Sequence, residues 1–217
     1  MNCTIGTVRV KPGAAAHFRI DEFTVTAEYA RAFNRREMWN RTRRFIQPGT
    51  YTKLSGTGRG VIMSNTPAEI NDHREAVDLA HGDVFIAGLG IGMVLEAILS
   101  KGDAVRSITV LEKEPEVIGL TAPYYAGEPK VSILCGDAFN PSAALPVGKR
   151  FDFLYFDIWD SICGDNYAEM KNLNREYRIY KAKGAKTLFW CRDLCKRQHF
   201  ASERRYSCMF APLGGIL

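Results

Sequence analysis

The sequence predicts an α/β fold with a doubly wound, mostly parallel sheet, preceded by a β-hairpin and a helix. From residue 83 onward, short runs rich in Val, Ile, Leu and Phe alternate with helix-like segments, as in a parallel sheet covered on both faces. The run at residues 83–87 leads into a glycine-rich turn, and a helix-like segment follows it. Glu112 ends the next apolar run, twenty residues past Gly92.

The first third of the chain is expected to form an extension in front of this sheet. Its predicted elements are strands at residues 4–10 and 16–26, a helix at 27–45 and a β-hairpin of residues 51–54 and 60–63. We therefore expect an N-terminal extension over residues 1–64 and a Rossmann-like domain over residues 65–217.

The second part begins with a helix start at Thr66-Pro67-Ala68-Glu69, where a Thr cap precedes Pro and Glu. The predicted strands are 83–87, 107–111, 131–134, 151–156 and 186–191, and the predicted helices are 66–80, 92–101, 115–125, 140–145 and 166–181. Doubly wound folds bind ligands beyond the carboxyl ends of their strands. We expect one crevice to be shared by the residues that follow the strands: 88–92, 112, 136–137 and 157–160.

The turn of residues 87–92, Ala-Gly-Leu-Gly-Ile-Gly, and Glu112 together predict a nucleotide-type site. Glycines allow a tight turn and close approach of a ligand, and the following helix start offers free N–H groups. The Glu112 carboxylate can accept hydrogen bonds from two ribose hydroxyls. A nicotinamide dinucleotide is the main competing ligand, and ordinary strand–helix packing is the alternative without a ligand.

Two further strands also end in acids, Asp137 and Asp157. Three carboxylates brought to one crevice destabilise the fold unless a ligand or cation neutralises them. A cationic nucleoside would do so.

Four segments resemble the class I S-adenosylmethionine-dependent methyltransferase fold, over about residues 64–191. They are residues 83–92, 110–118, 136–139 and 151–157. Within that fold the chain looks most like the spermidine synthase branch, in which the fourth strand ends in Asp-x-x-Asp. Asp157-Ile-Trp-Asp160 matches this element, and His73-Arg74-Glu75 stands in the place of a His-x-Glu element. The chain also looks like small methyltransferase-like proteins encoded by phages and bacteria.

The resemblance implies a role for each site residue. Gly88, Gly90 and Gly92 would hold the methionine portion of S-adenosylmethionine, Glu112 the ribose, and Asp137 with Ala138 the adenine edge. Asp157 would contact the reacting amine or the amino group of the cofactor. The implied catalytic residues are Asp157, Asp160 and His73, and the implied donor is S-adenosylmethionine or its decarboxylated form. For His73 and Asp160, a satisfied helix histidine and a capping carboxylate are the structural alternatives.

The chain departs from the spermidine synthases in its glycine turn, where they usually carry Gly-Gly-Gly-Asp-Gly-Gly, and in Ser161, where they carry proline. These departures favour methyl transfer to an amine or other small nucleophile. Aminopropyl transfer to a polyamine from decarboxylated S-adenosylmethionine stays as an alternative. A non-catalytic nucleic-acid-binding module on the same fold is the third possibility.

The net charge of +5 is unevenly distributed. Residues 31–60 hold eight basic residues, six of them from Arg31 to Arg44, and one acid, Glu37. A second basic stretch runs from Lys171 to Arg205. Such stretches can attract nucleic acid, and a solvated helix face with a basic tail is the alternative explanation.

Other features of the sequence limit the class of protein to which the chain can belong. The apolar stretches are well short of about 18 residues, and no signal-peptide pattern is present, so we expect a cytoplasmic protein without a membrane span. The six cysteines form no Cys-x-x-Cys pair and the four histidines are far apart, so we expect buried free thiols and no metal. The segment after the fifth strand is short, so a homo-oligomer in which a partner subunit completes the sheet is one of the expected arrangements.

Overall fold

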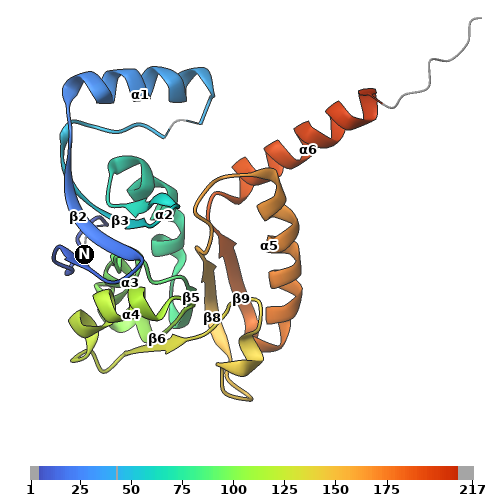
Figure 1. Cartoon of the computed structure of the whole chain (residues 1–217). Helices are drawn as coiled ribbons and strands as arrows, with labels where there is room; N and C mark the ends of the chain where they lie inside the picture. Colours follow the sequence, from blue (N-terminus) through green and yellow to red (C-terminus); the bar gives the residue numbers. More distant parts are fainter. Residues whose placement is uncertain (1–4, 43, 210–217) are drawn as a thin grey trace, which may run out of the picture.

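The computed structural model describes residues 5–42 and 44–209, and the side chains among them up to Ser202. Two sheets make up the framework (Figure 1). A four-stranded antiparallel sheet lies in the N-terminal part, and a five-stranded parallel sheet follows. The predicted fold class, a doubly wound parallel sheet behind an N-terminal hairpin and helix, is confirmed.

The antiparallel sheet has the strand order β1-β2-β3-β4. Its strands are β1 (Gly13–Ala14), β2 (Phe18–Val25), β3 (Gly49–Gly56) and β4 (Gly60–Ser64), with α1 (Ala27–Trp39) between β2 and β3. The predicted hairpin is confirmed as β3 and β4. The strand predicted at residues 4–10 is wrong for its described part, residues 5–10. There the chain is held by side chains, since Arg9 forms ion pairs of 2.6 and 2.5 Å with Glu96 and Glu128.

Helix α1 is shorter than the predicted 27–45 because its C-terminus is closed by backbone hydrogen bonds. Arg41 adopts a left-handed conformation with φ of 56°. The N–H groups of Arg41 and Thr42 donate to the carbonyls of Met38 and Glu37 at 3.1 Å each. This is the Schellman arrangement, with arginine in the position that glycine usually occupies.

The parallel sheet has the order β7-β6-β5-β8-β9. Its strands are β5 (Gly82–Ala87), β6 (Val105–Glu112), β7 (Val131–Cys135), β8 (Phe151–Phe156) and β9 (Lys181–Phe189). The helices are α2 (Pro67–Leu79), α3 (Met93–Leu99), α4 (Pro115–Thr121), α5 (Gly164–Glu176) and α6 (Arg192–Met209). Short 3-10 helices occupy Gly102–Ala104, Ala122–Tyr125, Pro141–Ala143 and Tyr177–Tyr180.

Several boundaries in this part differ from prediction, most of all after β8. The last predicted helix ends at Glu176 rather than at residue 181, because a 3-10 turn follows it, and β9 begins at Lys181 rather than at 186. The helix predicted at 140–145 is a single 3-10 turn. Helix α6 was not predicted, since its charged sequence has no regular apolar stripe.

Alternate residues of the central strand face two separate cores. Val84 and Ile86 join one cluster with α2, α3 and α4, whereas Phe85 and Ala87 join another with α5 and α6. Residues of the antiparallel sheet, among them Phe18, Ile20 and Leu54, belong to the first cluster. The hairpin therefore packs on the same side of the parallel sheet as α2, α3 and α4.

The strand order places a switch point beside β5. The chain proceeds from β5 to β6 and β7 in one direction, and then returns to β8 and β9 on the other side. Ligands of doubly wound folds bind at such a point, beyond the carboxyl ends of the strands. None of the described helices combines the length and the apolar character that crossing a membrane requires.

Candidate functional site

A pocket of about 400 Å³ lies at the switch point. It is lined by Gly88 and Gly90, by residues 111–114, 117, 136–139 and 157–160, and by Phe18, Leu54, Arg59, Ile62 and Met63 of the antiparallel sheet. The strand-end residues expected to share a crevice thus do lie together, apart from residues 89, 91 and 92. The size is within the usual range for a small-molecule site.

Backbone hydrogen bonds just past the strands bring these residues together. The Gly88 N–H donates to the Leu111 carbonyl at 2.9 Å, and the Asp157 N–H donates to the Ala87 carbonyl at 2.8 Å. The Gly136 N–H donates to the Glu112 carbonyl at 2.8 Å. The sheet ladder therefore continues one residue into each loop and holds the loops at one level.

Gly88 and Gly90 both have positive φ, 97° and 50°. A Cβ on Gly88 would lie 2.0 Å from the Asp157 carbonyl oxygen, so the backbone itself requires glycine there. A Cβ on Gly90 would lie 1.9 Å from Sδ of Met63, which reaches the turn from β4. The Ile91 N–H donates to that sulfur at 3.3 Å, so Met63 covers the glycine turn.

Gly92 does not line the pocket. It is the N-cap residue of α3 with φ of 76°, and a Cβ there would lie 2.6 Å from the Tyr125 hydroxyl. The same hydroxyl donates to the Gly92 carbonyl at 3.1 Å. Packing against Tyr125 therefore accounts for glycine at this position.

Glu112 at the end of β6 is buried, and the backbone fixes the direction of its carboxylate. One oxygen accepts from the Leu89 N–H at 2.8 Å, and the other accepts from the Glu114 N–H at 2.9 Å. Each carboxylate oxygen can accept a second hydrogen bond. The group is thus held in a fixed orientation and can still receive hydroxyl donors from the pocket.

The loop after β7 provides an acceptor beside an apolar surface. Oδ1 of Asp137 accepts from the Phe139 N–H at 2.9 Å, and Nζ of Lys113 lies 3.9 Å from its Oδ2. Ala138 is buried, whereas the Phe139 ring is 49% exposed and lines the pocket. Such a pairing suits a heteroaromatic base, which has polar edges and flat apolar faces.

Asp157 is a pocket carboxyl with a raised pKa. Burial raises the pKa of this group well above its usual range, and the carboxylates of Glu69, Asp72 and Glu112 raise it further. No described Lys or Arg forms an ion pair with it. A cation in the pocket would therefore be its natural partner.

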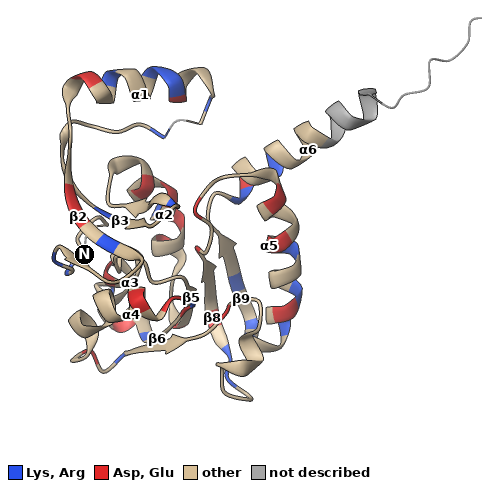
Figure 2. Ribbon diagram, viewed as in Figure 1, with Lys and Arg blue, Asp and Glu red and all other residues tan. Residues whose placement is uncertain are grey.

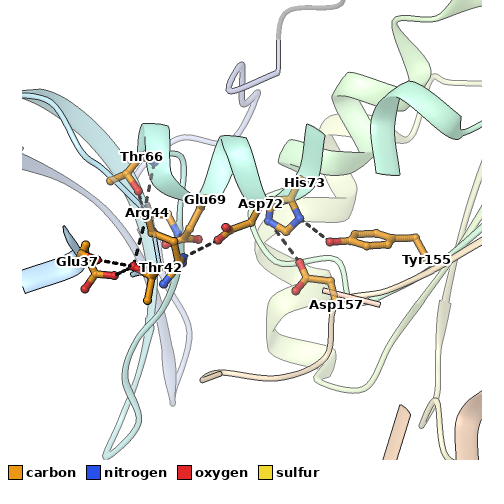
Figure 3. Close-up of polar contacts among 10 residues, drawn as sticks. Glu37, Thr42, Arg44, Thr66, Glu69, Asp72, His73, Tyr155 and Asp157 are labelled. Atoms are coloured by element: carbon orange, nitrogen blue, oxygen red, sulfur yellow. Dashed lines mark hydrogen bonds and ion pairs between the residues drawn. The ribbon is translucent and has the colours of Figure 1, made fainter. Parts of the chain in front are cut away.

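His73 lies behind Asp157 rather than in the pocket (Figure 3). It is 2% exposed, with Nδ1 2.7 Å from the Tyr155 hydroxyl and Nε2 3.8 Å from Oδ2 of Asp157. Burial lowers its pKa to about 3, helped by the Arg44 charge, so the ring is neutral near pH 7. This placement favours a positioning role over direct contact with a substrate.

Arg44 enters the same buried network from the segment after α1 (Figure 3). Its Nε donates to Oδ2 of Asp72 at 2.8 Å, and the guanidinium lies 5.8 Å from the centre of the Trp190 ring. The Thr42 hydroxyl donates to the buried Glu37 carboxylate nearby. Arg44 is therefore an internal cation, which corrects its assignment to a surface for nucleic acid.

Asp160 lines the pocket and is paired with a residue that sequence reasoning did not place in the site. Nε and one terminal nitrogen of Arg59 each lie 2.7 Å from an oxygen of Asp160. Arg59 comes from the turn between β3 and β4. In the sequence it was only one of the eight basic residues at positions 31–60. Its position in a Gly-rich hairpin turn was the only signal in the sequence.

Other predicted features are also located. Among the described residues, no group of three or more His, Cys, Asp or Glu is arranged to hold a metal ion. The described cysteines 135, 163, 191 and 195 are free thiols, but only Cys195 is buried and Cys135 is exposed. Cys3 and Arg43 lie outside the described residues, as do the side chains of Arg204, Arg205 and Cys208.

Comparisons with known proteins come from solved structures. No protein-family model matches the sequence, and no curated protein matches it. An S-adenosylmethionine-dependent methyltransferase from Clostridium acetobutylicum ATCC 824 matches at 17% identity and a TM-score of 0.39, over 56% of this chain and 46% of that one. TrmN from Thermus thermophilus matches at 18% identity and a TM-score of 0.46, over 61% and 41%.

Aeropyrum pernix fibrillarin, crystallised with natively bound S-adenosyl-L-methionine, matches at 18% identity and a TM-score of 0.41, over 49% of this chain and 44% of that one. The matched segment covers less than half the length of each of these three proteins. At such identities and TM-scores the matches assign no activity to this chain, so its function has to follow from the residues of its own site.

Proposed function

We propose that the pocket binds S-adenosylmethionine and that the protein transfers the donor's methyl group to an amine or other small nucleophile. One observation carries the proposal. The carboxyl groups of Glu112, Asp137 and Asp157 meet beside the Gly88–Gly90 turn in one pocket of about 400 Å³.

The pocket suits each part of this donor. Glu112 is oriented by two backbone N–H groups and can accept from both ribose hydroxyls. Asp137, Ala138 and Phe139 combine an acceptor with apolar surface for the adenine. Asp157, with a raised pKa and no cationic partner among the described residues, suits a positively charged sulfonium or amine.

The charge of the pocket argues against a nicotinamide dinucleotide, whose pyrophosphate is negative. Among its described lining residues are five acids (Glu112, Glu114, Asp137, Asp157 and Asp160) and two bases (Arg59 and Lys113). Asp160 neutralises Arg59, so little positive charge is left for a phosphate. A cationic donor is attracted by the same arrangement.

Bound S-adenosylmethionine supplies a methyl carbon activated by the sulfonium. The chain's own part is to align the acceptor and to manage its proton. Asp157 would accept a hydrogen bond from an acceptor N–H. It would take the proton lost when nitrogen bonds to the methyl carbon and the carbon–sulfur bond breaks, with the electron pair of that bond staying on sulfur. His73, held by Tyr155, would lie behind Asp157 at the pocket wall, with Nε2 3.8 Å from Oδ2 of Asp157.

Aminopropyl transfer is the alternative within the same donor chemistry. It requires a polyamine, and the resemblance gives the second acid of Asp-x-x-Asp the task of holding that substrate. Here the Asp160 carboxylate is taken up by two 2.7 Å contacts with Arg59. A cation already in this position supports methyl transfer over aminopropyl transfer.

Isothermal titration calorimetry tests the donor. We expect S-adenosylmethionine to bind, and Glu112→Gln to weaken binding about tenfold because one charged acceptor is lost. Glu22→Gln, at an exposed glutamate of β2, is the matched control and should bind as the parent does. Absence of binding, or an unchanged affinity in Glu112→Gln, would refute the proposal.

Mass spectrometry tests the transfer. The protein is incubated with S-adenosylmethionine or its decarboxylated form and with a panel of polyamines, nucleotides and nucleic acids. We expect a product heavier by one CH₂ group with S-adenosylmethionine only. A product heavier by an aminopropyl group, formed with the decarboxylated donor, would establish the alternative.

A further inference from the structure

We propose that the outer face of α1 is a docking surface for single-stranded nucleic acid. Arg31, Arg35 and Trp39 follow one another at four-residue spacing, so their side chains form one row along the helix. All three are exposed, Trp39 at 87%. We call this row the α1 ridge.

The α1 ridge lowers the stability of the protein when no ligand is bound to it. Arg31 and Arg35 are like charges one helical turn apart, which destabilises a helix. Neither forms an ion pair or hydrogen bond with another described residue. A largely exposed tryptophan beside them leaves apolar surface in water. An anionic ligand with flat apolar groups would offset both costs.

The helix that presents the ridge is anchored on its other side. The Thr26 hydroxyl caps its N-terminus by accepting from the Tyr29 N–H at 3.1 Å. The Asn34 side chain bonds the Ile46 backbone twice, at 2.9 and 2.8 Å, and Ala30 is buried. The ridge is therefore held outward on a fixed support, which lowers the entropic cost of binding.

Several arginines of the basic stretch at residues 31–60 already have partners within the protein. Arg44 is partly buried and paired with Asp72, and Arg59 is paired with Asp160. Arg36 lies 3.3 Å from Glu37 and over the Phe33 ring. The remaining unpaired arginines of α1 are those of the ridge. Figure 2 shows the basic residues of α1 in blue.

The mixing of side chains favours nucleic acid over an anionic membrane. A helix that lies in a membrane surface separates its charged face from its apolar face. On the α1 ridge the tryptophan lies in line with the arginines. Arginines contact phosphates, and an aromatic ring stacks on an unpaired base, which is the usual composition of single-strand sites.

Fluorescence anisotropy with a labelled oligonucleotide of about 20 nucleotides, longer than common site sizes, tests the proposal. Arg31→Glu with Arg35→Glu should weaken binding by at least about tenfold. It should also reduce the slope of log K against log salt by about 1.4, as expected for two lost phosphate contacts. Lys11→Glu with Arg150→Glu, the same charge change at exposed positions outside both basic stretches, is the matched control and should bind as the parent does.

Trp39 provides a second readout. Stacking on a base should quench its fluorescence, and Trp39→Ala should weaken single-strand binding about tenfold. A duplex of the same sequence should bind more weakly and without dependence on Trp39, because its bases are already stacked.

Three results would overturn the proposal: no binding at about 50 mM salt, equal loss in the control variant, or binding to phosphatidylserine vesicles but not to the oligonucleotide. The titration contains no methyl donor, so its outcome is independent of the proposed methyl transfer. Donor binding without oligonucleotide binding would refute the docking surface alone, and the reverse result would refute the donor alone.

Discussion

The guanidinium of Arg59 forms a two-point ion pair with Asp160, with two N–O distances of 2.7 Å. The pair joins the turn of the N-terminal hairpin to the loop after β8, positions 101 residues apart. Glu114 lies 3.5 Å from the same guanidinium. The pair thereby holds the hairpin in place as one wall of the pocket.

Breaking this pair should loosen the hairpin with little effect on global stability. Both side chains are about one-third or more exposed, so we expect Arg59→Gln to lower the free energy of unfolding by less than about 1 kcal/mol. Hydrogen exchange at residues 56–60 should become faster, and S-adenosylmethionine should bind several-fold more weakly. Asp160→Asn should have the same effects. The double variant should lose no more stability and no more affinity for the donor than either single variant does. Additive effects in the double variant would show that the two residues act separately.

The parallel half of the fold could be predicted because its local patterns agree with its tertiary environment. β5 and β8 are short apolar runs buried on both faces, and their predicted bounds differ from the observed ones by at most one residue. Helix α6 could not be predicted this way. It packs on α5 through Cys195 and through ring contacts of His199 and Phe200 with Tyr167, which make no regular apolar stripe.

The position of a site residue could be predicted only where that residue lies at the end of a parallel strand. Glu112, Asp137 and Asp157 each lie at or just beyond the end of a strand, and parallel strands bring such residues together. Arg59 and Met63 reach the pocket from an antiparallel hairpin, a tertiary relation that no local pattern encodes. The depth of His73 likewise depends on how α2 packs against β8.

The two pocket glycines should respond differently to substitution. A Cβ on Gly90 meets the flexible end of Met63, whereas a Cβ on Gly88 meets the Asp157 carbonyl in the backbone. In urea unfolding, Gly90→Ala should therefore be partly rescued by Met63→Ala, with a coupling free energy of about 1–3 kcal/mol. Gly88→Ala should lose about 3 kcal/mol or more and gain nothing from Met63→Ala. Equal rescue at both positions would show that the strain at Gly88 is not in the backbone.

Asp157 should reduce stability near neutral pH. Burial raises its pKa in the folded state above the unfolded value of about 3.9, so between these two pKa values the folded protein binds more protons. Stability therefore falls as pH rises through this window. Asp157→Asn should match the parent near pH 3 and be more stable by about 1–3 kcal/mol near pH 8. Urea midpoints across this range check the prediction, and an advantage that did not grow with pH would contradict it.

Donor binding should release a proton from Asp157. The pKa of this carboxyl is raised in the free protein, and a sulfonium beside it would lower that pKa, so part of the population must lose a proton on binding. Affinity for S-adenosylmethionine should therefore rise with pH until the free-state pKa is passed. Calorimetry in two buffers of different protonation enthalpy measures the proton number directly.

Two controls isolate the cause of this proton release. S-adenosylhomocysteine has the same amino acid end but a neutral sulfur, so it should release fewer protons. Asp157→Asn should abolish the difference between the two ligands, because no titrating carboxyl is left beside the sulfur. The same release for both ligands in the parent protein would place Asp157 near the amino group of the donor instead, since that charge is common to both.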